Sequence, residues 1–348
     1  MQPRISVLIV DDSAAYRNAL RDVLASDPGL DVVGQASNGR LALPRIRYHK
    51  PAVVILDQEM PEMDGLSTLA AIREEWPAVH VIMFSSRTQR GAETTVKALQ
   101  LGAADFLAKP AEKDTDIPLY LRSHLLPRIH ALGQRFSLSY SSHMRSNVTG
   151  DFKVAALGIS TGGPPVLKTI LNKLNRGLHA SVLIVQHMPP VFTAQLARSL
   201  SETSGIPVKE AEDAEPLAPG FAYIAPGGRH LEVSSDGSQL RITDGDPELS
   251  CRPSVNVLFR SVARAFGPQA LGLILTGMGE DGYSGIQEIR ARGGKIIAQS
   301  QDSCLIFGMP ARPVREGLVD AVLSPDKIAE RLNELFAGVR TRVILPPI

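Results

Sequence analysis

The chain has 348 residues, with 37 lysines and arginines against 36 aspartates and glutamates. This balance gives no electrostatic reason to expect nucleic acid or an anionic membrane as the main partner. No apolar run approaches the roughly 20 residues that cross a bilayer, and acids directly follow the short apolar run at the start, so we expect neither a membrane span nor a signal peptide. With only two cysteines, Cys251 and Cys304, we expect a reduced, cytoplasmic protein whose thiols are packed or idle rather than nucleophilic.

Residues 4–130 alternate short apolar runs with helical patterns. Five runs predict strands: ISVLIV, LDVVGQA, AVVILD, HVIMFSS and ADFLAKP. Five such βα units predict a doubly wound parallel sheet, the α/β class, in which ligands bind beyond the carboxyl ends of the strands.

Polar residues stand at those strand ends. Asp11 and Asp12 follow the first strand and Asp57 ends the third, while Ser85 and Lys109 end the fourth and fifth. Three carboxylates at one sheet edge suit Mg²⁺, and a hydroxyl and a lysine suit the remaining oxygens of a phosphoryl group. An aspartate at a strand end can also be a helix N-cap, but five matched positions favour a phosphoryl site.

The segments VLIVDDSAAYR, VVILDQEMPEMDGL, IMFSS and ADFLAKP resemble the receiver domain of two-component response regulators, over about residues 4–125. The resemblance implies a flavodoxin-like fold that needs Mg²⁺ for phosphorylation. The roles that it implies are phosphorylation at Asp57, metal binding by Asp11, Asp12, Asp57 and the backbone carbonyl of Glu59, and switch or phosphoryl contacts by Ser85, Phe106 and Lys109. Gln58 lies at a position where receivers vary, and we assign it no role.

A serine-rich stretch without sustained periodicity, GQRFSLSYSSHMRSNVTG, separates this part from the next. We expect His143 within it to be a solvated linker residue. The predicted division is a receiver domain over residues 1–130, a linker over 131–150 and a catalytic domain over 151–340.

The strand pattern then restarts in FKVAALGIS, ASVLIVQHMPP, QALGLILTGMGEDG and GGKIIAQS, with helical patterns between the runs. We expect a second doubly wound, mainly parallel α/β domain. Turn glycines between the short runs of PGFAYIAPGGRHLEV and SQLRIT predict an antiparallel hairpin.

The turn after the first of these strands carries a serine between glycines. GISTG matches the G-x-S-x-G motif, in which a tight strand-to-helix turn exposes a nucleophilic hydroxyl, here that of Ser160. Pro164 and Pro165 suit the start of a helix. The motif alone leaves open a glycine turn with an incidental serine, whereas its spacing differs from the G-x-G-x-x-G dinucleotide loop.

A nucleophilic serine needs a general base, and the base needs an orienting carboxylate. His187 ends one predicted strand and Asp281 follows another, so both meet Ser160 at one sheet edge; His230, in the predicted hairpin, is the reserve candidate for the base. The chain order Ser, His, Asp differs from those of α/β-hydrolases, subtilisin and chymotrypsin.

The segments GISTGGP, VQHMPP, YIAPGGRHLEV, RPSVNVLFRSVA, LTGMGEDG and CLIFGMP resemble the methylesterase domain of chemotaxis protein-glutamate methylesterases, over about residues 152–336. The resemblance implies a Ser160–His187–Asp281 triad that needs no cofactor, demethylates glutamyl γ-methyl esters of methyl-accepting chemotaxis receptors and deamidates certain receptor glutamines. A chemotaxis histidine kinase would be the phosphodonor. Backbone N–H groups after Thr161 and at Met278 are candidate oxyanion donors, and the Thr161 side chain would support the histidine or cap the next helix.

Two other functions stay open at this point. The second domain could bind receptors without catalysis, making the chain a phosphate sink or scaffold, although the complete triad argues against it. The triad also fits a hydrolase of another ester in a different signalling array, because substrate choice depends on the shape of the groove.

Overall fold

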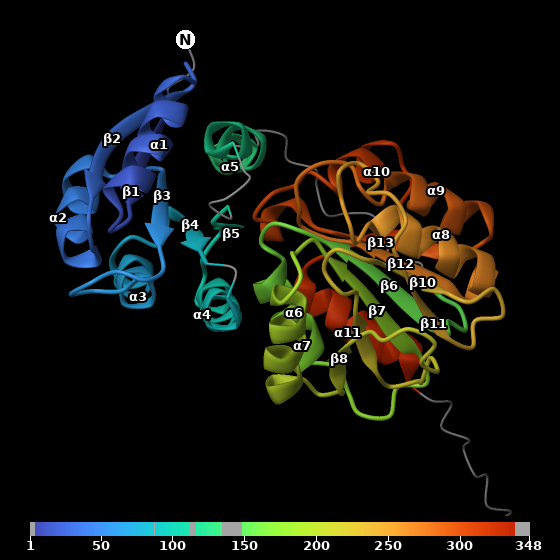
Figure 1. The fold of residues 1–348 in the computed structure, drawn as a ribbon. Coiled ribbons are helices and arrows are strands. Elements are labelled where there is room, and N and C mark those ends of the chain that lie inside the picture. Colours follow the sequence, from blue (N-terminus) through green and yellow to red (C-terminus); the bar gives the residue numbers. More distant parts are fainter. Residues whose placement is uncertain (1–3, 87, 111–115, 134–147, 338–348) are drawn as a thin grey trace, which may run out of the picture.

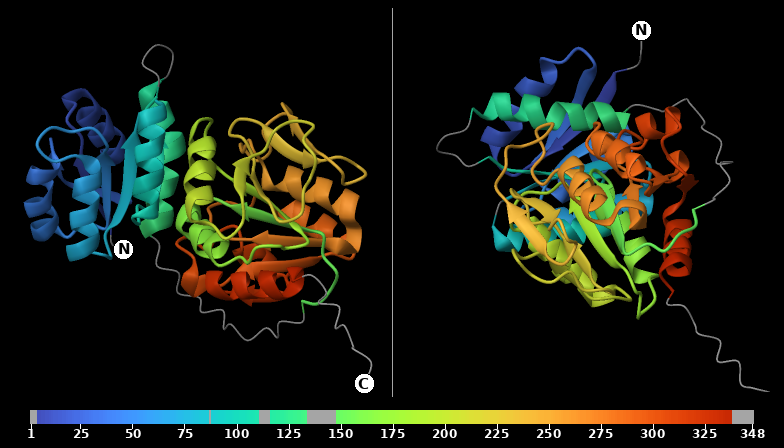
Figure 2. Two further views of the ribbon diagram at one scale, coloured as in Figure 1. Left: turned by 90° about the horizontal axis from the view of Figure 1, so that it is seen from below. Right: turned by 90° about the vertical axis from the view of Figure 1, so that its right-hand side faces the viewer.

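The structure is a computed structural model that describes residues 4–86, 88–110, 116–133 and 148–337 (Figure 1). It consists of two α/β units side by side, an N-terminal unit up to residue 133 and a C-terminal unit from residue 148 (Figure 2). Most of the predicted linker, His143 included, lies outside the described residues.

The N-terminal unit has a five-stranded parallel sheet in the order β2-β1-β3-β4-β5, the flavodoxin-like order that the sequence predicts. Its helices begin where polar side chains accept from free backbone N–H groups, as Ser13, Asn38, Asp64 and Thr88 do. Apolar contacts place α1 and α5 on one face of the sheet and α2, α3 and α4 on the other. The bounds are β1 Ile5–Val10, α1 Ala14–Ala25, β2 Leu30–Ala36, α2 Gly39–His49, β3 Val53–Asp57, α3 Gly65–Glu75, β4 His80–Ser85, α4 Gln89–Gln100, β5 Asp105–Ala108 and α5 Ile117–Gly133.

The C-terminal unit is built on a seven-stranded sheet in the order β14-β13-β12-β6-β7-β9-β8, with parallel pairing throughout. Helices α6, α7 and α11 cover one face, and α8 and α9 cover the other. Burial on both faces explains why the central strands read as continuous apolar runs. The bounds are β6 Val154–Ile159, α6 Gly163–Asn172, β7 Ser181–Gln186, α7 Phe192–Thr203, β8 Val208–Glu210, β9 Ala222–Ile224, α8 Val255–Phe266, β12 Ala270–Ile274, α9 Tyr283–Ala291, β13 Lys295–Gln299, α10 Ala311–Arg315, β14 Ala321–Leu323 and α11 Pro325–Phe336, with short 3₁₀ turns at Gly267–Gln269 and Gln301–Ser303.

The predicted hairpin is present but smaller than expected. β10 (His230–Val233) pairs antiparallel with β11 (Leu240–Thr243). The run AYI, which we expected in the hairpin, instead forms β9 and joins the main sheet in parallel with β7. Runs of three residues, such as β8, β9 and β14, are too short for sequence periodicity to indicate their partners.

The two units share an apolar interface in which α4 and β5 face α6 and α7 (Figures 1 and 2). The rings of Phe106 and Phe192 lie 4.6 Å apart between centroids across it. Gln100 Nε2 donates to Ser199 Oγ at 2.9 Å. In a second contact, Ile306 is buried in the apolar cluster of the N-terminal unit. The interface therefore touches loops at the strand ends of the C-terminal sheet.

None of the described helices combines the length and the apolar character that crossing a membrane requires.

Candidate functional site

The N-terminal unit brings its predicted site residues together at one sheet edge. Lys109 Nζ lies 2.8 Å from Asp57 Oδ1 and 3.1 Å from Asp11 Oδ2. One carboxylate oxygen each from Asp11, Asp12 and Asp57 lies within 4.8 Å of the others. Glu59 follows two residues after Asp57 and is exposed. Three aspartates and the Lys109 ammonium therefore lie together at the ends of the central strands.

The charges of this cluster favour binding of a further cation. Burial, and then the neighbouring Asp11, raise the pKa of Asp57 to about 6 against the opposing effect of Lys109. Burial also raises the pKa of Asp11, whose Oδ2 lies 3.1 Å from the Lys109 ammonium. Carboxylates that repel one another around a single ammonium supply the oxygen ligands that suit a hard divalent ion such as Mg²⁺.

Sequence reasoning missed a buried network behind the phosphoryl site. Ser85 Oγ donates to Gln58 Oε1 at 2.8 Å, and Gln58 Nε2 donates to the carbonyl of Gly91 at 3.0 Å. Thr95 Oγ1 lies 2.7 Å from Ser85 Oγ and joins the network from α4. Gln58, to which we assigned no role, therefore fixes the hydroxyl of the predicted switch residue.

Ser160 occupies the turn between β6 and α6. Its N–H donates to the carbonyl of Thr276 at 3.0 Å, and its own carbonyl accepts from Gly163 N at 2.8 Å. The left-handed residue of the turn is Gly162, with φ of 79°, and a Cβ there would lie 2.7 Å from Leu305 Cβ. Both the backbone conformation and the close packing thus require glycine at position 162, two residues after the serine.

His187 follows β7, the neighbouring strand, and its N–H donates to the carbonyl of Ile159 at 3.1 Å. This bond sets the histidine beside the Ser160 turn. His187 Nε2 lies 2.8 Å from Asp281 Oδ2. Within the described residues the ring nitrogens of His187 contact Asp281 and Cys251, and no hydrogen bond joins the ring to Ser160 Oγ. The structure thus joins His187 to Asp281 and places Ser160 in the turn that follows the adjacent strand, β6.

Asp281 is held as a carboxylate by the start of α8. It accepts from the backbone N–H groups of Val255 at 2.7 Å and Asn256 at 3.0 Å, and from Ser254 Oγ at 2.9 Å. Burial alone would raise its pKa, but the bonds to His187 and to the helix start hold the pKa below its usual value. The sequence segment RPSVN, which carried no assigned role, supplies these donors.

The surroundings of His187 favour its protonated form. Its burial disfavours the cation, but the hydrogen bonds that it makes with Asp281 and Cys251 outweigh this effect and raise the pKa of His187 to about 9. Stabilising the imidazolium is what an orienting carboxylate contributes in a Ser-His-Asp arrangement.

His230, the reserve candidate, is fully engaged elsewhere. Its Nε2 lies 3.0 Å from the carbonyl of Asp246, and its Nδ1 accepts from Ser254 N at 3.2 Å. With both ring nitrogens bonded to the backbone and the side chain buried, His230 has a structural role.

The predicted oxyanion donors lie around the same turn. Within the part of the chain that the structure describes, the backbone N–H groups of Thr161 and Met278 have no acceptor. The N-cap of α6 is Gly162, so the Thr161 side chain does not cap this helix. Its Oγ1 instead donates to Asp105 Oδ2 of the N-terminal unit at 2.7 Å. Asp105 was not predicted from the sequence, because only the relative placement of the two units gives it a partner.

Cys251 was expected to be packed or idle, and the structure places its thiol beside His187. Its Sγ lies 3.9 Å from His187 Nδ1, and the residue is partly exposed. No motif in the sequence placed this thiol beside the histidine.

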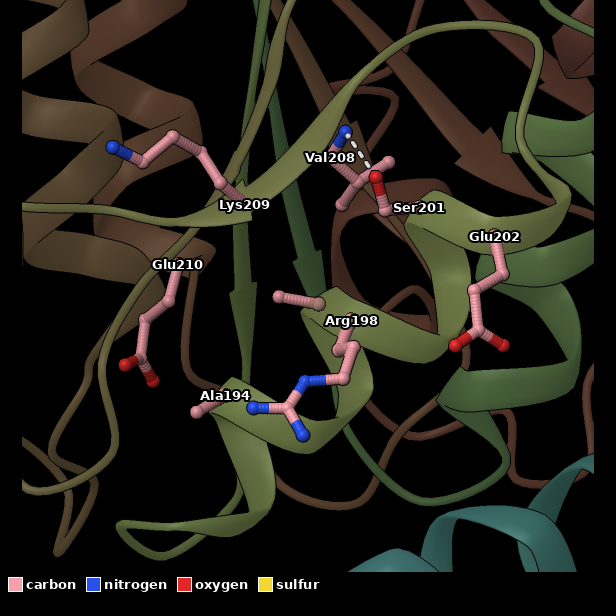
Figure 3. A pocket seen from close by; sticks show the side chains of 8 residues that line it. Ala194, Arg198, Ser201, Glu202, Val208, Lys209 and Glu210 are labelled. Carbon is pink, nitrogen blue, oxygen red and sulfur yellow. Dashed lines mark hydrogen bonds between the residues drawn. The ribbon is translucent and has the colours of Figure 1, made fainter.

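A surface hollow between α7 and β8 is lined by charges of both signs, including Arg198, Glu202, Lys209 and Glu210 (Figure 3). None of its lining residues belongs to the predicted site.

The fold of the N-terminal unit and its Asp–Lys cluster are those of a response regulator. The C-terminal unit is a parallel α/β domain with a His–Asp pair at the ends of its strands. Two family models match the chain, the response regulator receiver domain over residues 7–117 and CheB methylesterase over residues 155–332. The chain therefore belongs to the CheB methylesterase family.

Full-length relatives agree with this assignment. The protein-glutamate methylesterase/protein-glutamine glutaminase of Trichodesmium erythraeum is 42% identical over 347 residues, covering 95% of this chain and 98% of that protein. That of Desulfotalea psychrophila is 39% identical over 357 residues, covering 94% and 97%. The crystal structure of the Thermotoga maritima CheB methylesterase catalytic domain is 40% identical with a TM-score of 0.52, and the match covers 53% of this chain and 100% of that one.

Proposed function

We propose that this chain is a phosphorylation-regulated protein-glutamate methylesterase of the cytoplasm. It hydrolyses glutamyl γ-methyl esters on methyl-accepting chemotaxis receptors and deamidates certain receptor glutamines by the same acyl transfer. The observation that carries the proposal is the 2.8 Å contact between His187 Nε2 and Asp281 Oδ2, one strand away from the Ser160 turn.

Ser160 Oγ attacks the carbonyl carbon of the ester. Because Nε2 of His187 is engaged by Asp281, Nδ1 is the nitrogen that takes the hydroxyl proton. The proton then passes to the leaving methanol, or to ammonia when the substrate is a glutamine. Water, activated by the same nitrogen, hydrolyses the acyl-serine and restores the hydroxyl.

The tetrahedral intermediates carry a negative oxygen that needs donors. The backbone N–H groups of Thr161 and Met278 flank the Ser160 turn and are the candidates. Loss of one such donor typically costs about 10²–10³ in rate.

Asp57 accepts the phosphoryl group from a chemotaxis histidine kinase. Asp11, Asp12, Asp57 and the Glu59 carbonyl would hold Mg²⁺, which neutralises phosphoryl oxygens when bound. Lys109 contacts the phosphoryl group, Ser85 donates its hydroxyl to it, and Phe106 carries the change to the interface with α7.

The resting receiver inhibits the esterase by occupying loops that substrate must approach. Support comes from the Thr161–Asp105 hydrogen bond, one residue from the nucleophile, and from Met278 and Leu305, which pack against the receiver. A receptor is a bulky substrate, so a receiver in this position would obstruct it.

The catalytic assignment is tested with full-length variants on radiolabelled, methylated receptor membranes. We expect Ser160→Ala and His187→Ala to lose nearly all methanol release, because triad members act as a unit. Phosphate incorporation at Asp57 should be retained, which shows that the variants are folded. His230→Gln is the matched control and should lose far less activity than His187→Ala.

Substantial methanol release by folded Ser160→Ala protein would exclude Ser160 as the nucleophile. A greater loss in His230→Gln than in His187→Ala would exclude His187 as the base.

A further inference from the structure

The thiol of Cys251 lies beside the imidazole of His187, which is next to the Ser160 turn. Cys251 Sγ lies 3.9 Å from Nδ1, on the side of the ring opposite the nitrogen that Asp281 holds. Cys251 is partly exposed as a residue.

A tight turn presents this thiol. The N–H of Cys251 donates to the Glu248 carbonyl at 2.9 Å, and Glu248 N donates back at 3.1 Å. Between them Leu249 and Ser250 have φ of 50° and 63°, a conformation that costs free energy for residues other than glycine. Arg260 from α8 ion-pairs with Glu248 and ties the turn to the helix that also binds Asp281.

The spacing of the two donor atoms suits one tetrahedral metal ion. A Zn–S bond of about 2.3 Å and a Zn–N bond of about 2.0 Å at a tetrahedral angle separate sulfur from nitrogen by about 3.5 Å. The observed 3.9 Å is within reach of that separation after a small side-chain movement. Thiolate and imidazole are also the ligand types that Zn²⁺ prefers over Mg²⁺.

Asp281 contacts the ring nitrogen of His187 that does not face Cys251. A metal-binding histidine usually donates its other N–H to a carboxylate, which fixes the ring and its tautomer. Asp281 Oδ2 occupies this place at Nε2. Asp281 itself is a poor direct ligand, because the start of α8 already donates to both of its oxygens.

We propose that Cys251 Sγ and His187 Nδ1 form an inhibitory binding site for Zn²⁺ and similar thiophilic divalent ions. Binding releases the thiol proton, and the Nδ1 proton of His187 where the ring is protonated, to solvent. It places the metal on the nitrogen lone pair that Ser160 needs for its own proton. The inhibitory effect rests on the proposed role of His187 as the base, whereas the metal binding does not. With only two protein ligands, water fills the remaining positions and the ion is removable.

Metal binding is measured first, on full-length protein with Mg²⁺ present in excess to occupy the receiver carboxylates. Co²⁺ is the probe, because a thiolate ligand gives it an intense near-ultraviolet charge-transfer band that oxygen ligands do not give. We expect the band in the unmodified protein and in Cys304→Ser, and its loss in Cys251→Ser. A band that survives in Cys251→Ser and disappears in Cys304→Ser would overturn the proposal.

Inhibition is measured second, as methanol release from receptor membranes over a series of ZnCl₂ concentrations. Each variant is compared with its own rate in the chelator EDTA. Half-inhibition of Cys251→Ser should need at least tenfold more Zn²⁺ than half-inhibition of the unmodified protein or of Cys304→Ser. Equal sensitivity in all three would refute the inhibitory role.

Ser160→Ala separates this proposal from the catalytic one. It should lack esterase activity and still give the cobalt band. An active Ser160→Ala protein that gives the band would contradict the triad and support the metal site. If Ser160→Ala is inactive and neither it nor the unmodified protein gives the band, the triad is supported and the metal site is refuted.

Discussion

At the scale of single residues, we expect Gln58 to influence how readily Ser85 can donate its hydroxyl to the phosphoryl group. A hydroxyl has one proton to donate, and in the resting structure Ser85 gives it to Gln58 Oε1 at 2.8 Å. Turning toward a phosphoryl oxygen leaves that buried amide oxygen without a donor, at a cost of about 1–3 kcal/mol. Gln58 therefore favours the resting state.

Replacing Gln58 by leucine should remove this competition. We expect Gln58→Leu to reach half-maximal esterase stimulation at a several-fold lower concentration of a small phosphodonor, measured as methanol release. Asp57→Asn is the control and should show a low activity that no donor changes. An unchanged or higher donor requirement in Gln58→Leu, with its thermal stability retained, would argue against a restraining role.

At the scale of elements, the contact between β5 and the start of α6 connects regulation to chemistry. Asp105, the first residue of β5, accepts from Thr161 at 2.7 Å and from Arg128 Nε at 3.1 Å. A hydrogen bond to a charged group contributes about 1.5–3 kcal/mol, and about 1.4 kcal/mol is a factor of ten in an equilibrium constant. Loss of this bond should weaken the closed arrangement markedly.

Asp105→Ala should therefore raise the esterase rate of unphosphorylated protein several-fold. Arg128→Ala is the matched control, because it breaks the ion pair of Asp105 and leaves the bond to Thr161. Methanol release without phosphodonor compares the two. Equal rates in both variants would show that the Thr161 bond does not restrain the enzyme.

At the scale of the whole molecule, the receiver is predicted to inhibit by covering the catalytic loops. A fragment beginning at Val148 lacks that cover and keeps the complete C-terminal sheet. We expect it to hydrolyse receptor methyl esters faster than the resting full chain at equal concentration, and to ignore phosphodonor. Circular dichroism checks its folding. A folded fragment no faster than the resting chain would indicate a receiver that activates by improving the site instead of uncovering it.

The sequence predicts features that depend on local patterns better than contacts between segments that are distant in the chain. The strands that end at Asp57 or directly before Ser160 and His187 are largely apolar runs of five or six residues, so the sequence pattern predicts them. Parallel topology then brings their ends together. The three-residue strands and the pairing of AYI depend on tertiary packing. The Thr161–Asp105 bond and the approach of Cys251 to His187 join segments 56 and 64 residues apart, and no local pattern encodes such meetings.

The position of Phe106 has a thermodynamic consequence that reaches the receptor. Phe106 packs on Phe192 in the same interface in which Thr161 donates to Asp105. Under the proposed function, the phosphoryl site and the ester-binding face would therefore act on one closed–open equilibrium. Linkage is reciprocal, so if phosphorylation favours binding of a receptor, that receptor must favour phosphorylation by the same factor. The enzyme would then accumulate aspartyl phosphate preferentially while docked at its substrate, and receptor clusters would concentrate the active form without any further targeting signal.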